Sequence, residues 1–243
     1  MRILITNDDS INSPVLAPLA QWAQKLGEVT VVVPKFEQSG KSHSIELHKP
    51  FEVLRREDLV PGVRTFTVDS SPADCVRYAI LGMGEKFDLV ISGINRGLNI
   101  GLDIIYSGTA GAASEAVALG CKAIALSTEP ESFDSAIAQL DAVWEIFNRH
   151  DLLARHDLYN VNIPLTVKGV RFTRQGGPYY SDDFPAIGND LVRPNGKCVY
   201  EEGNDYTVDT HAVLHGYISI SPLVVDRTAW ELFGELNRLN PEK

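Results

Sequence analysis

The sequence predicts an α/β fold in which a mostly parallel sheet is covered by helices on both faces. Three observations lead to this prediction. Short apolar runs recur along the first half of the chain, and segments with helical periodicity separate them. The runs are continuous rather than alternating, which indicates strands that are buried on both sides. Polar clusters follow several runs, as is typical of strand ends that face a ligand.

The first half of the chain is expected to alternate between strands and helices. The run at 3–5 predicts the first strand. Ser13 offers a helix cap and Pro14 suits a first helical position, so a helix is expected over 15–26, ended by Gly27. The β-branched run 29–33 predicts a strand that Pro34 stops. The remaining expected elements are irregular strands within 45–54, strands at 64–68, 89–91 and 123–126, a helix at 72–81 capped by Ser70 or Ser71, a helix that follows the glycine-rich loop 92–111 and runs to 119, and a helix at 133–149.

The composition changes near Asp151. Strands are expected at 159–163, 170–173 and 217–220, and a terminal helix at 227–239. A long polar stretch rich in Gly, Pro, Asn and Asp occupies 174–209, with strand-like pieces around 179–180 and 199–200. Because so long a loop is rare within a compact domain, this stretch is expected to form a projecting hairpin or arm.

Charge and hydropathy exclude several classes of partner. The formal net charge of −10 argues against nucleic-acid polymers and anionic membranes, while a small phosphate ester stays compatible with it. The sequence has neither a run long enough to span a bilayer nor a secretory pattern at its start, so a cytoplasmic protein is expected. The cysteines lack metal-site spacing and are expected to be buried free thiols, at Cys75, Cys121 and Cys198.

Two adjacent carboxylates, Asp8 and Asp9, follow the first predicted strand. Because the backbone turns at a strand end, both side chains can face one site. Their mutual repulsion would be neutralised most simply by a hard divalent cation. A helix-capping pair or a solvated turn is the structural alternative, and the Asp-Asp pair alone does not decide between them.

Two further loops carry groups suited to a ligand. Residues 37–44, Glu-Gln-Ser-Gly-Lys-Ser-His-Ser, combine small hydroxyl residues with Lys41 and His43. Taken alone, this segment is better explained as an ordinary surface loop, with His43 as a solvated turn residue. Residues 92–101 place Asn95 and Asn99 among three glycines, which allow close backbone approach. The glycine spacing matches neither a dinucleotide-binding fingerprint nor a P-loop.

The segment 106–111, Tyr-Ser-Gly-Thr-Ala-Gly, directly precedes a predicted helix. Backbone amides at a helix start, flanked by hydroxyl groups, bind phosphate well. A plain helix cap is the common alternative. A carboxylate metal site facing an anion site at a helix terminus suits phosphoryl chemistry.

These residues resemble the SurE family, stationary-phase survival proteins that are metal-dependent 5′/3′-nucleotidases. The matching segments occur in the family's order and spacing. They are Asn7-Asp8-Asp9, Ser39-Gly40, Ser71-Pro72-Ala73-Asp74-Cys75-Val76, Ser92-Gly93-Ile94-Asn95, Tyr106-Ser107-Gly108-Thr109, and the segments 160–164 and 216–223.

The resemblance implies an enzyme that hydrolyses nucleoside 5′-monophosphates, with 3′-monophosphates as further candidates, to nucleoside and phosphate. It also implies one divalent cation per subunit, Mg²⁺ or Mn²⁺. The implied metal ligands are Asp8, Asp9, Ser39 and Asn95. The implied phosphate contacts are Asn99, Ser107, Gly108 and Thr109. Asp8 and Asp9 are the catalytic candidates, and Asp8 would orient or deprotonate the attacking water.

The resemblance further implies a Rossmann-like three-layer architecture. Residues 1–150 would form the catalytic domain. Residues 151–243 would add strands, a hairpin arm and a terminal helix that complete the same domain. Exchange of the arm and the helix between subunits would make a homodimer or a homotetramer.

This chain departs from the family at a few positions. Ser10 stands where a Gly usually follows the two aspartates, so a positive φ there would strain it. Arg96 replaces a small residue and is expected at the rim or on the substrate. His43 occupies a position where Asn is also usual, so a histidine proton donor is not a general requirement of the family. Residues 71–76 lie near the family's site without a clear catalytic role.

Other classes of function compete with this interpretation. An aspartyl-phosphate phosphatase would use a strand-end Asp as nucleophile, but its aspartates are two positions apart. A non-catalytic nucleotide-binding or metal-sensing module is less favoured, because it would not need the complete set of metal-ligand and phosphate-contact positions that this sequence contains. A purely structural oligomer is the least favoured alternative, because core packing does not require polar residues at four strand ends.

Overall fold

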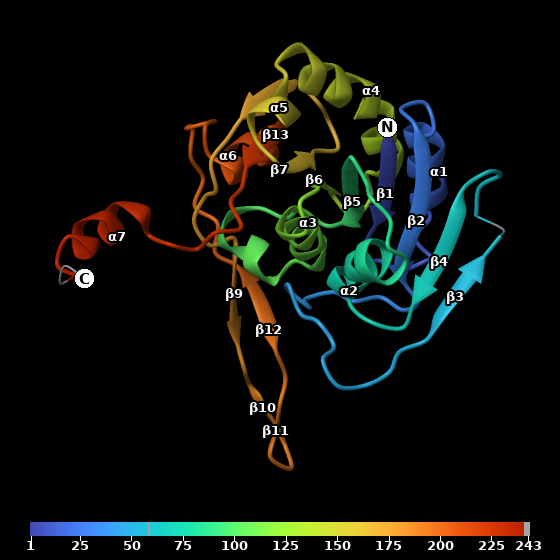
Figure 1. Cartoon of the computed structure of the whole chain (residues 1–243). Helices are drawn as coiled ribbons and strands as arrows, with labels where there is room; N and C mark the ends of the chain where they lie inside the picture. Colours follow the sequence, from blue (N-terminus) through green and yellow to red (C-terminus); the bar gives the residue numbers. More distant parts are fainter. Residues whose placement is uncertain (58, 241–243) are drawn as a thin grey trace.

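The computed structural model describes residues 1–57 and 59–240, and it has the predicted α/β architecture. The described residues form a nine-stranded, mostly parallel sheet in the order β3-β4-β2-β1-β5-β6-β7-β13-β8 (Figure 1). Its strands are β1 Arg2–Thr6, β2 Glu28–Pro34, β3 Val53–Arg56, β4 Arg64–Val68, β5 Leu89–Arg96, β6 Lys122–Thr128, β7 Leu158–Ile163, β8 Gly169–Phe172 and β13 Tyr217–Pro222.

Helices cover both faces of the sheet. On one face, α1 (Leu16–Ala23) and α4 (Phe133–Arg149) pack with Ile5 of β1 in one buried cluster. On the other face, α2 (Pro72–Arg77) and α3 (Gly108–Ala118) pack with Leu4 of β1 in a second cluster. Alternate residues of β1 therefore face opposite cores, which explains the unbroken apolar run in the sequence.

The parallel pairing brings the candidate segments to one edge of the sheet. β1 lies between β2 and β5, with Ile5 opposite both Val31 and Ile91. Thr6 is likewise opposite Ser92. Because all three strands run in the same direction, the loops that follow them leave from the same edge.

Several expected boundaries were wrong. β5 continues to Arg96, so residues 92–96 are strand rather than loop, and Asn95 pairs with Ser127 of β6. Residues 45–52 contain no strand, and β3 begins at Val53. Helix α1 begins at Leu16 without a side-chain cap, and Ser13 Oγ is buried without a hydrogen-bond partner.

The helix expected at 72–81 is divided, because α2 ends at Arg77 and a π-helix, η1 (Tyr78–Gly82), follows it directly. Short elements that the sequence did not predict complete the fold: a 3₁₀ helix, η2 (Gly101–Tyr106), and the short helices α5 (Leu152–Arg155) and α6 (Asp209–Leu214). Among the described residues, no helix has the length and apolar character needed to cross a membrane. Cys75 and Cys121 are buried as expected, whereas Cys198 is exposed.

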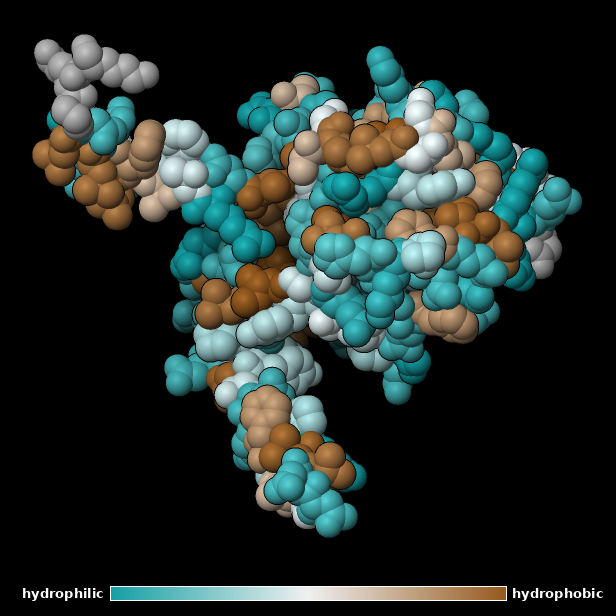
Figure 2. Space-filling model, turned by 60° about the horizontal axis from the view of Figure 1, so that its bottom comes forward, coloured by the Kyte–Doolittle hydropathy of each residue, from teal (hydrophilic) through white to brown (hydrophobic). Residues whose placement is uncertain are grey.

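Two projections leave the body of the molecule. The first is a hairpin built from β9 (Tyr180–Asp183), β10 (Ala186–Gly188), β11 (Leu191–Val192) and β12 (Asn195–Cys198). The second is α7 (Trp230–Asn237), which has no buried residue. Figure 1 shows both extending away from the sheet, and Figure 2 shows hydrophobic side chains on each. The projecting hairpin agrees with the expectation for 174–209.

Gly93 gives a direct test of how β5 is packed. A Cβ there would lie 2.3 Å from the Leu126 carbonyl oxygen of β6, and its φ is +145°. We expect Gly93→Ala to lower the free energy of unfolding by about 3 kcal/mol or more. The strain of a positive φ and the overlap of the new Cβ with the backbone of β6 both contribute to this loss. Gly120→Ala is the control: it has a φ of +85° but open space, and should cost about 1 kcal/mol. Equal losses in urea unfolding would contradict the close contact.

Candidate functional site

A tight turn after β1 presents Asp8 and Asp9. The side-chain amide nitrogen of Asn7 donates to the Ser10 carbonyl oxygen at 2.9 Å, which closes the turn. Ser10 has a φ of 72°, the left-handed region that favours glycine. The strain expected at this position is therefore present, and Ser10 Oγ offsets part of it by accepting from the Asn12 amide at 3.3 Å.

Asp8 points at the start of helix α3. Thr109 Oγ1 donates to Asp8 Oδ1 at 2.7 Å, and Asp8 is only 4% exposed. The backbone amide of Thr109 also favours the charged carboxylate. One predicted metal ligand thus contacts one predicted phosphate contact directly, although 101 residues separate them along the chain.

Asp9 is joined to the end of β5. The Arg96 backbone amide donates to Asp9 Oδ2 at 2.9 Å, which places neighbouring Asn95 beside the turn. The Asn95 amide nitrogen donates to the Gly97 carbonyl oxygen at 2.8 Å. The carbonyl oxygen of the Asn95 side chain therefore remains as a donor atom for a cation.

The loop after β2 brings Ser39 to the same turn. The Gln38 backbone amide donates to the Asp8 carbonyl oxygen at 2.8 Å. Ser39 Oγ donates its proton to Glu37 Oε1 at 2.7 Å, so its lone pairs remain for a cation. The four residues expected to hold the metal therefore come from three segments that hydrogen bonds tie together.

The electrostatics of the two carboxylates suit a divalent cation. Burial raises the pKa of Asp8 to about 6, and the charge on Asp9 adds to this shift. Burial also raises the pKa of Asp9, and the charge on Glu37 adds to it, while the Arg96 amide opposes it. Both groups thus resist ionisation unless a positive charge is nearby, and a hard cation supplies that charge.

The donor chemistry sets the kind of metal that fits. Among the described residues, no three His, Cys, Asp or Glu side chains form a cluster suited to a metal. A cation at this turn would instead bind two carboxylates, one hydroxyl and one amide oxygen. An all-oxygen set of this kind fits Mg²⁺ or Mn²⁺ and leaves positions for water and phosphate oxygens.

The first turn of α3 carries the residues that are expected to contact phosphate. Ser107 caps the helix by accepting from the Ala110 amide at 3.0 Å. The amides of Gly108 and Thr109 lie in the first turn, where they have no partner within the helix. The same turn faces Asp8, so an anion there would lie beside the carboxylates.

Asn99 is held differently from the other predicted phosphate contacts. Its side-chain amide donates to Ser127 Oγ of β6 at 2.8 Å. Its backbone nitrogen and oxygen bond to the side chains of Asn160 and Asn162 on β7. The two β7 asparagines were missed as positioning residues. Their alternation in a buried strand was the signal that could have identified them.

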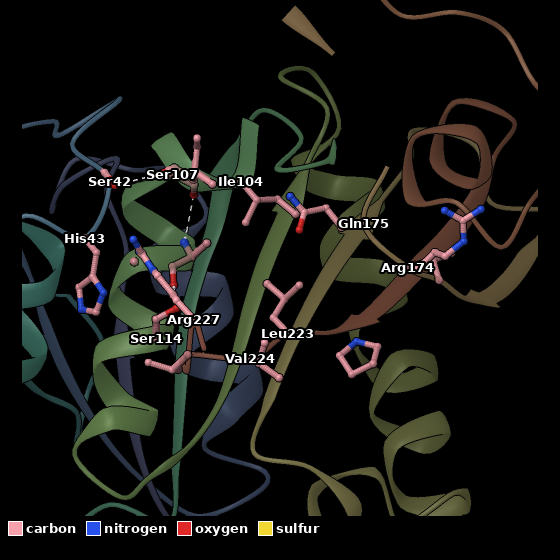
Figure 3. Close-up of a pocket in the computed structure, with 16 residues that line it drawn as sticks. Ser42, His43, Ile104, Ser107, Ser114, Arg174, Gln175, Leu223, Val224 and Arg227 are labelled. Atoms are coloured by element: carbon pink, nitrogen blue, oxygen red, sulfur yellow. Dashed lines mark hydrogen bonds between the residues drawn. The ribbon is translucent and has the colours of Figure 1, made fainter. Parts of the chain in front are cut away.

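Two pockets flank this arrangement. One of about 600 Å³ opens beside Asp9 and Ser39 and is also lined by Phe36 and Arg96. The other, of about 750 Å³, runs along α3 from Ser107 (Figure 3). Tyr106, the first residue of the segment 106–111, is 61% exposed.

Comparisons with known proteins agree with this architecture. A family model described as Survival protein SurE matches residues 3–182. A protein from Syntrophotalea carbinolica named 5′-nucleotidase SurE is 39% identical, over 98% of this chain and 97% of its own length. A protein of the same name from Natranaerobius thermophilus is 35% identical, over 98% of each chain.

A solved structure shows the same relationship in three dimensions. The crystal structure of the SurE protein from Aquifex aeolicus superposes with a TM-score of 0.78 at 34% identity. The match covers 98% of this chain and 99% of that one. The sequence match and the shared fold extend over nearly the whole chain, and the chain belongs to the SurE family.

Proposed function

We propose that this protein is a metal-dependent phosphomonoesterase that hydrolyses nucleoside 5′-monophosphates to nucleoside and phosphate. The relatives named 5′-nucleotidase SurE support this function. The observation that carries the proposal is the 2.7 Å contact between Thr109 Oγ1 and Asp8 Oδ1. It joins a carboxylate suited to a cation to the helix start suited to a phosphate, as hydrolysis of a phosphate ester requires.

The metal would be held by Asp8, Asp9, Ser39 and Asn95, and it would be Mg²⁺ or Mn²⁺. When bound, such a cation supplies charge neutralisation at the phosphoryl group and acidifies water. Asp8 would orient the attacking water or accept its proton. Its contact with the first turn of α3 supports this role.

The helix start would stabilise the phosphoryl oxygens. The backbone amides of Gly108 and Thr109 point out of the first turn, and Ser107 lies beside them. Such donors act on the charge that develops on the equatorial oxygens. Asn99 would contribute through the hydrogen of its amide that does not bond to Ser127.

Phosphate release from a set of nucleoside 5′- and 3′-monophosphates tests the proposal. Each substrate is assayed with Mg²⁺, with Mn²⁺ and with a chelator. We expect release from 5′-monophosphates that depends on the metal and stops with the chelator. Metal-dependent binding of nucleotide without phosphate release would favour a binding module instead.

We also propose that subunits exchange the hairpin and α7 in a homodimer or homotetramer. The exposed apolar side chains on these projections support this: they are Phe184, Ile187, Leu191, Val192, Trp230, Leu232, Phe233 and Leu236. Such residues are costly in water unless another surface covers them. We expect light scattering to show an oligomer, and Leu232→Glu combined with Phe233→Glu to reduce its mass. An unchanged mass in the variant would contradict a role for α7.

A further inference from the structure

The loop that carries Ser39 has no regular structure to hold it. Residues 39–46 form neither helix nor strand, and Ser39 itself is exposed. A segment of this kind is ordered only by contacts with other elements. Three sets of contacts attach it to α2, to α3 and to η2. We call the residues whose side chains make these contacts the loop clamp: Ser42, His43, Ser71, Asp74, Arg77 and Glu115.

The first contact attaches the loop to the segment before the phosphate site. The Ser42 amide donates to the Tyr106 carbonyl oxygen at 2.9 Å, and Ser42 Oγ donates to the Ile105 carbonyl oxygen at 2.6 Å. The loop backbone also lies against α3, because a Cβ on Gly111 would be 2.4 Å from the Ser42 oxygen. Figure 3 shows Ser42 close to Ser107 at the start of this helix.

The second contact is a chain of hydrogen bonds that joins the loop to α3 and α2. His43 Nε2 lies 2.7 Å from Glu115 Oε2 of α3, and Arg77 of α2 donates to Glu115 Oε1 at 2.8 Å. The hydrogen bond from His43, with that from Arg77, lowers the pKa of Glu115. Glu115 is only 7% exposed, so this pairing is more persistent than a surface ion pair. His43 is therefore not a solvated turn residue.

The third set of contacts gives residues 71–76 a structural role, whereas the sequence indicated no clear catalytic role for them. Asp74 is 3% exposed, and its Oδ2 accepts from the Glu46 amide of the loop at 2.8 Å. Ser70 Oγ donates to the same oxygen at 2.6 Å. Ser71 Oγ donates to the Ser44 carbonyl oxygen at 2.6 Å. The start of α2 thus holds the far end of the loop.

We propose that His43 and Asp74 are positioning residues that hold the Ser39 loop against α2 and α3, so that Ser39 stays beside Asp8 and Asp9. The proposal rests on the proposed function, since it takes Ser39 as a metal ligand. His43 acts through the loop rather than on substrate. Its partner Glu115 lies two turns beyond Ser107, about 12 Å along the helix.

Direct Mn²⁺ binding, measured by calorimetry without substrate, tests the clamp. We expect the Mn²⁺ dissociation constant to rise about tenfold in Asp74→Asn and a few-fold in His43→Ala, as the loss of hydrogen bonds to charged groups implies. Saturating Mn²⁺ should restore kcat in both variants. His48→Ala is the matched control, because this imidazole is exposed two residues beyond the loop and has no side-chain hydrogen bond in the described part of the chain. The Mn²⁺ affinity of this variant should stay unchanged.

A double-mutant cycle tests whether His43 affects Mn²⁺ binding through Ser39. If His43 acts through Ser39, adding His43→Ala to Ser39→Ala should weaken Mn²⁺ binding no further. Additive losses would overturn the proposal, as would wild-type Mn²⁺ affinity in both His43→Ala and Asp74→Asn. If Asp74→Asn does not fold, the Mn²⁺ affinity of His43→Ala still tests the proposal. Mn²⁺ binding by the wild type without phosphate release would contradict the proposed function alone, since the clamp is measured by Mn²⁺ affinity.

Discussion

Asp8→Asn is expected to abolish phosphate release and also to stabilise the metal-free protein at pH 7. The loss of activity follows from removing a metal ligand and the group that handles the attacking water, a role that contributes about 10²- to 10⁴-fold. The gain in stability follows from burial. The pKa of Asp8 rises from 3.8 to about 6 in the folded protein, so ionising it there is costly.

The sign of the pH dependence follows from proton binding. Between the unfolded pKa of 3.8 and the folded pKa of about 6, the folded state holds a proton on Asp8 that the unfolded state has lost. The free energy of unfolding therefore falls as pH rises through this window. The cost at pH 7 is about 3 kcal/mol, and Asn avoids it because it carries no charge.

Urea unfolding with a chelator measures this effect. The variant should exceed the wild type by about 3 kcal/mol at pH 7, and the difference should nearly vanish at pH 4. Added Mn²⁺ should stabilise the wild type and leave the variant unchanged. Equal stability of the two proteins at pH 7 would contradict a buried, ionised Asp8. Wild-type turnover by the variant with added metal would contradict its assignment as a ligand and catalytic residue.

Thr109→Val is expected to have the second largest effect. The substitution keeps the shape of a fully buried side chain and removes the hydroxyl that donates to Asp8 Oδ1. A hydrogen bond to a charged group contributes about 1.5–3 kcal/mol, so kcat/KM should fall by about 10- to 100-fold. The pKa of Asp8 should rise further, because the hydroxyl favours the charged carboxylate.

Thr109→Ser serves as the matched control for this hydroxyl. It keeps the donor and loses only a methyl group, so most of the activity should be retained. Steady-state kinetics of phosphate release at saturating Mn²⁺ compares the three proteins. If Thr109→Ser lost as much activity as Thr109→Val, packing rather than the hydrogen bond to Asp8 would explain the effect.

The strand-end clusters were predictable from the sequence because parallel strands share an edge. Asp8, Ser39 and Asn95 each follow or end a predicted strand, and the hydrogen bonds of the turn bring their segments together. The helix at 133–149 was also predicted with its observed bounds, since its apolar periodicity is strong. Local sequence patterns were therefore sufficient to predict the side chains at the ends of parallel strands and the bounds of a strongly periodic helix.

Contacts between distant segments set the features that the sequence did not reveal. Residues 92–96 contain Gly93 and looked like a loop, but pairing with β6 extends the strand. His43 and Glu115 are 72 residues apart, so no local pattern indicated their contact. Ser13 has the residue type of a cap, yet α1 begins at Leu16. For residues 92–96, pairing with a neighbouring strand thus overrides the local preference for a loop.

A crystal structure with Mn²⁺ and inorganic phosphate tests most directly the claim that metal and phosphate share one site. We predict an anomalous Mn²⁺ peak among oxygens of Asp8, Asp9, Ser39 and Asn95, with phosphate on the amides of Gly108 and Thr109. Mn²⁺ bound elsewhere, or phosphate bound away from the first turn of α3, would contradict the account.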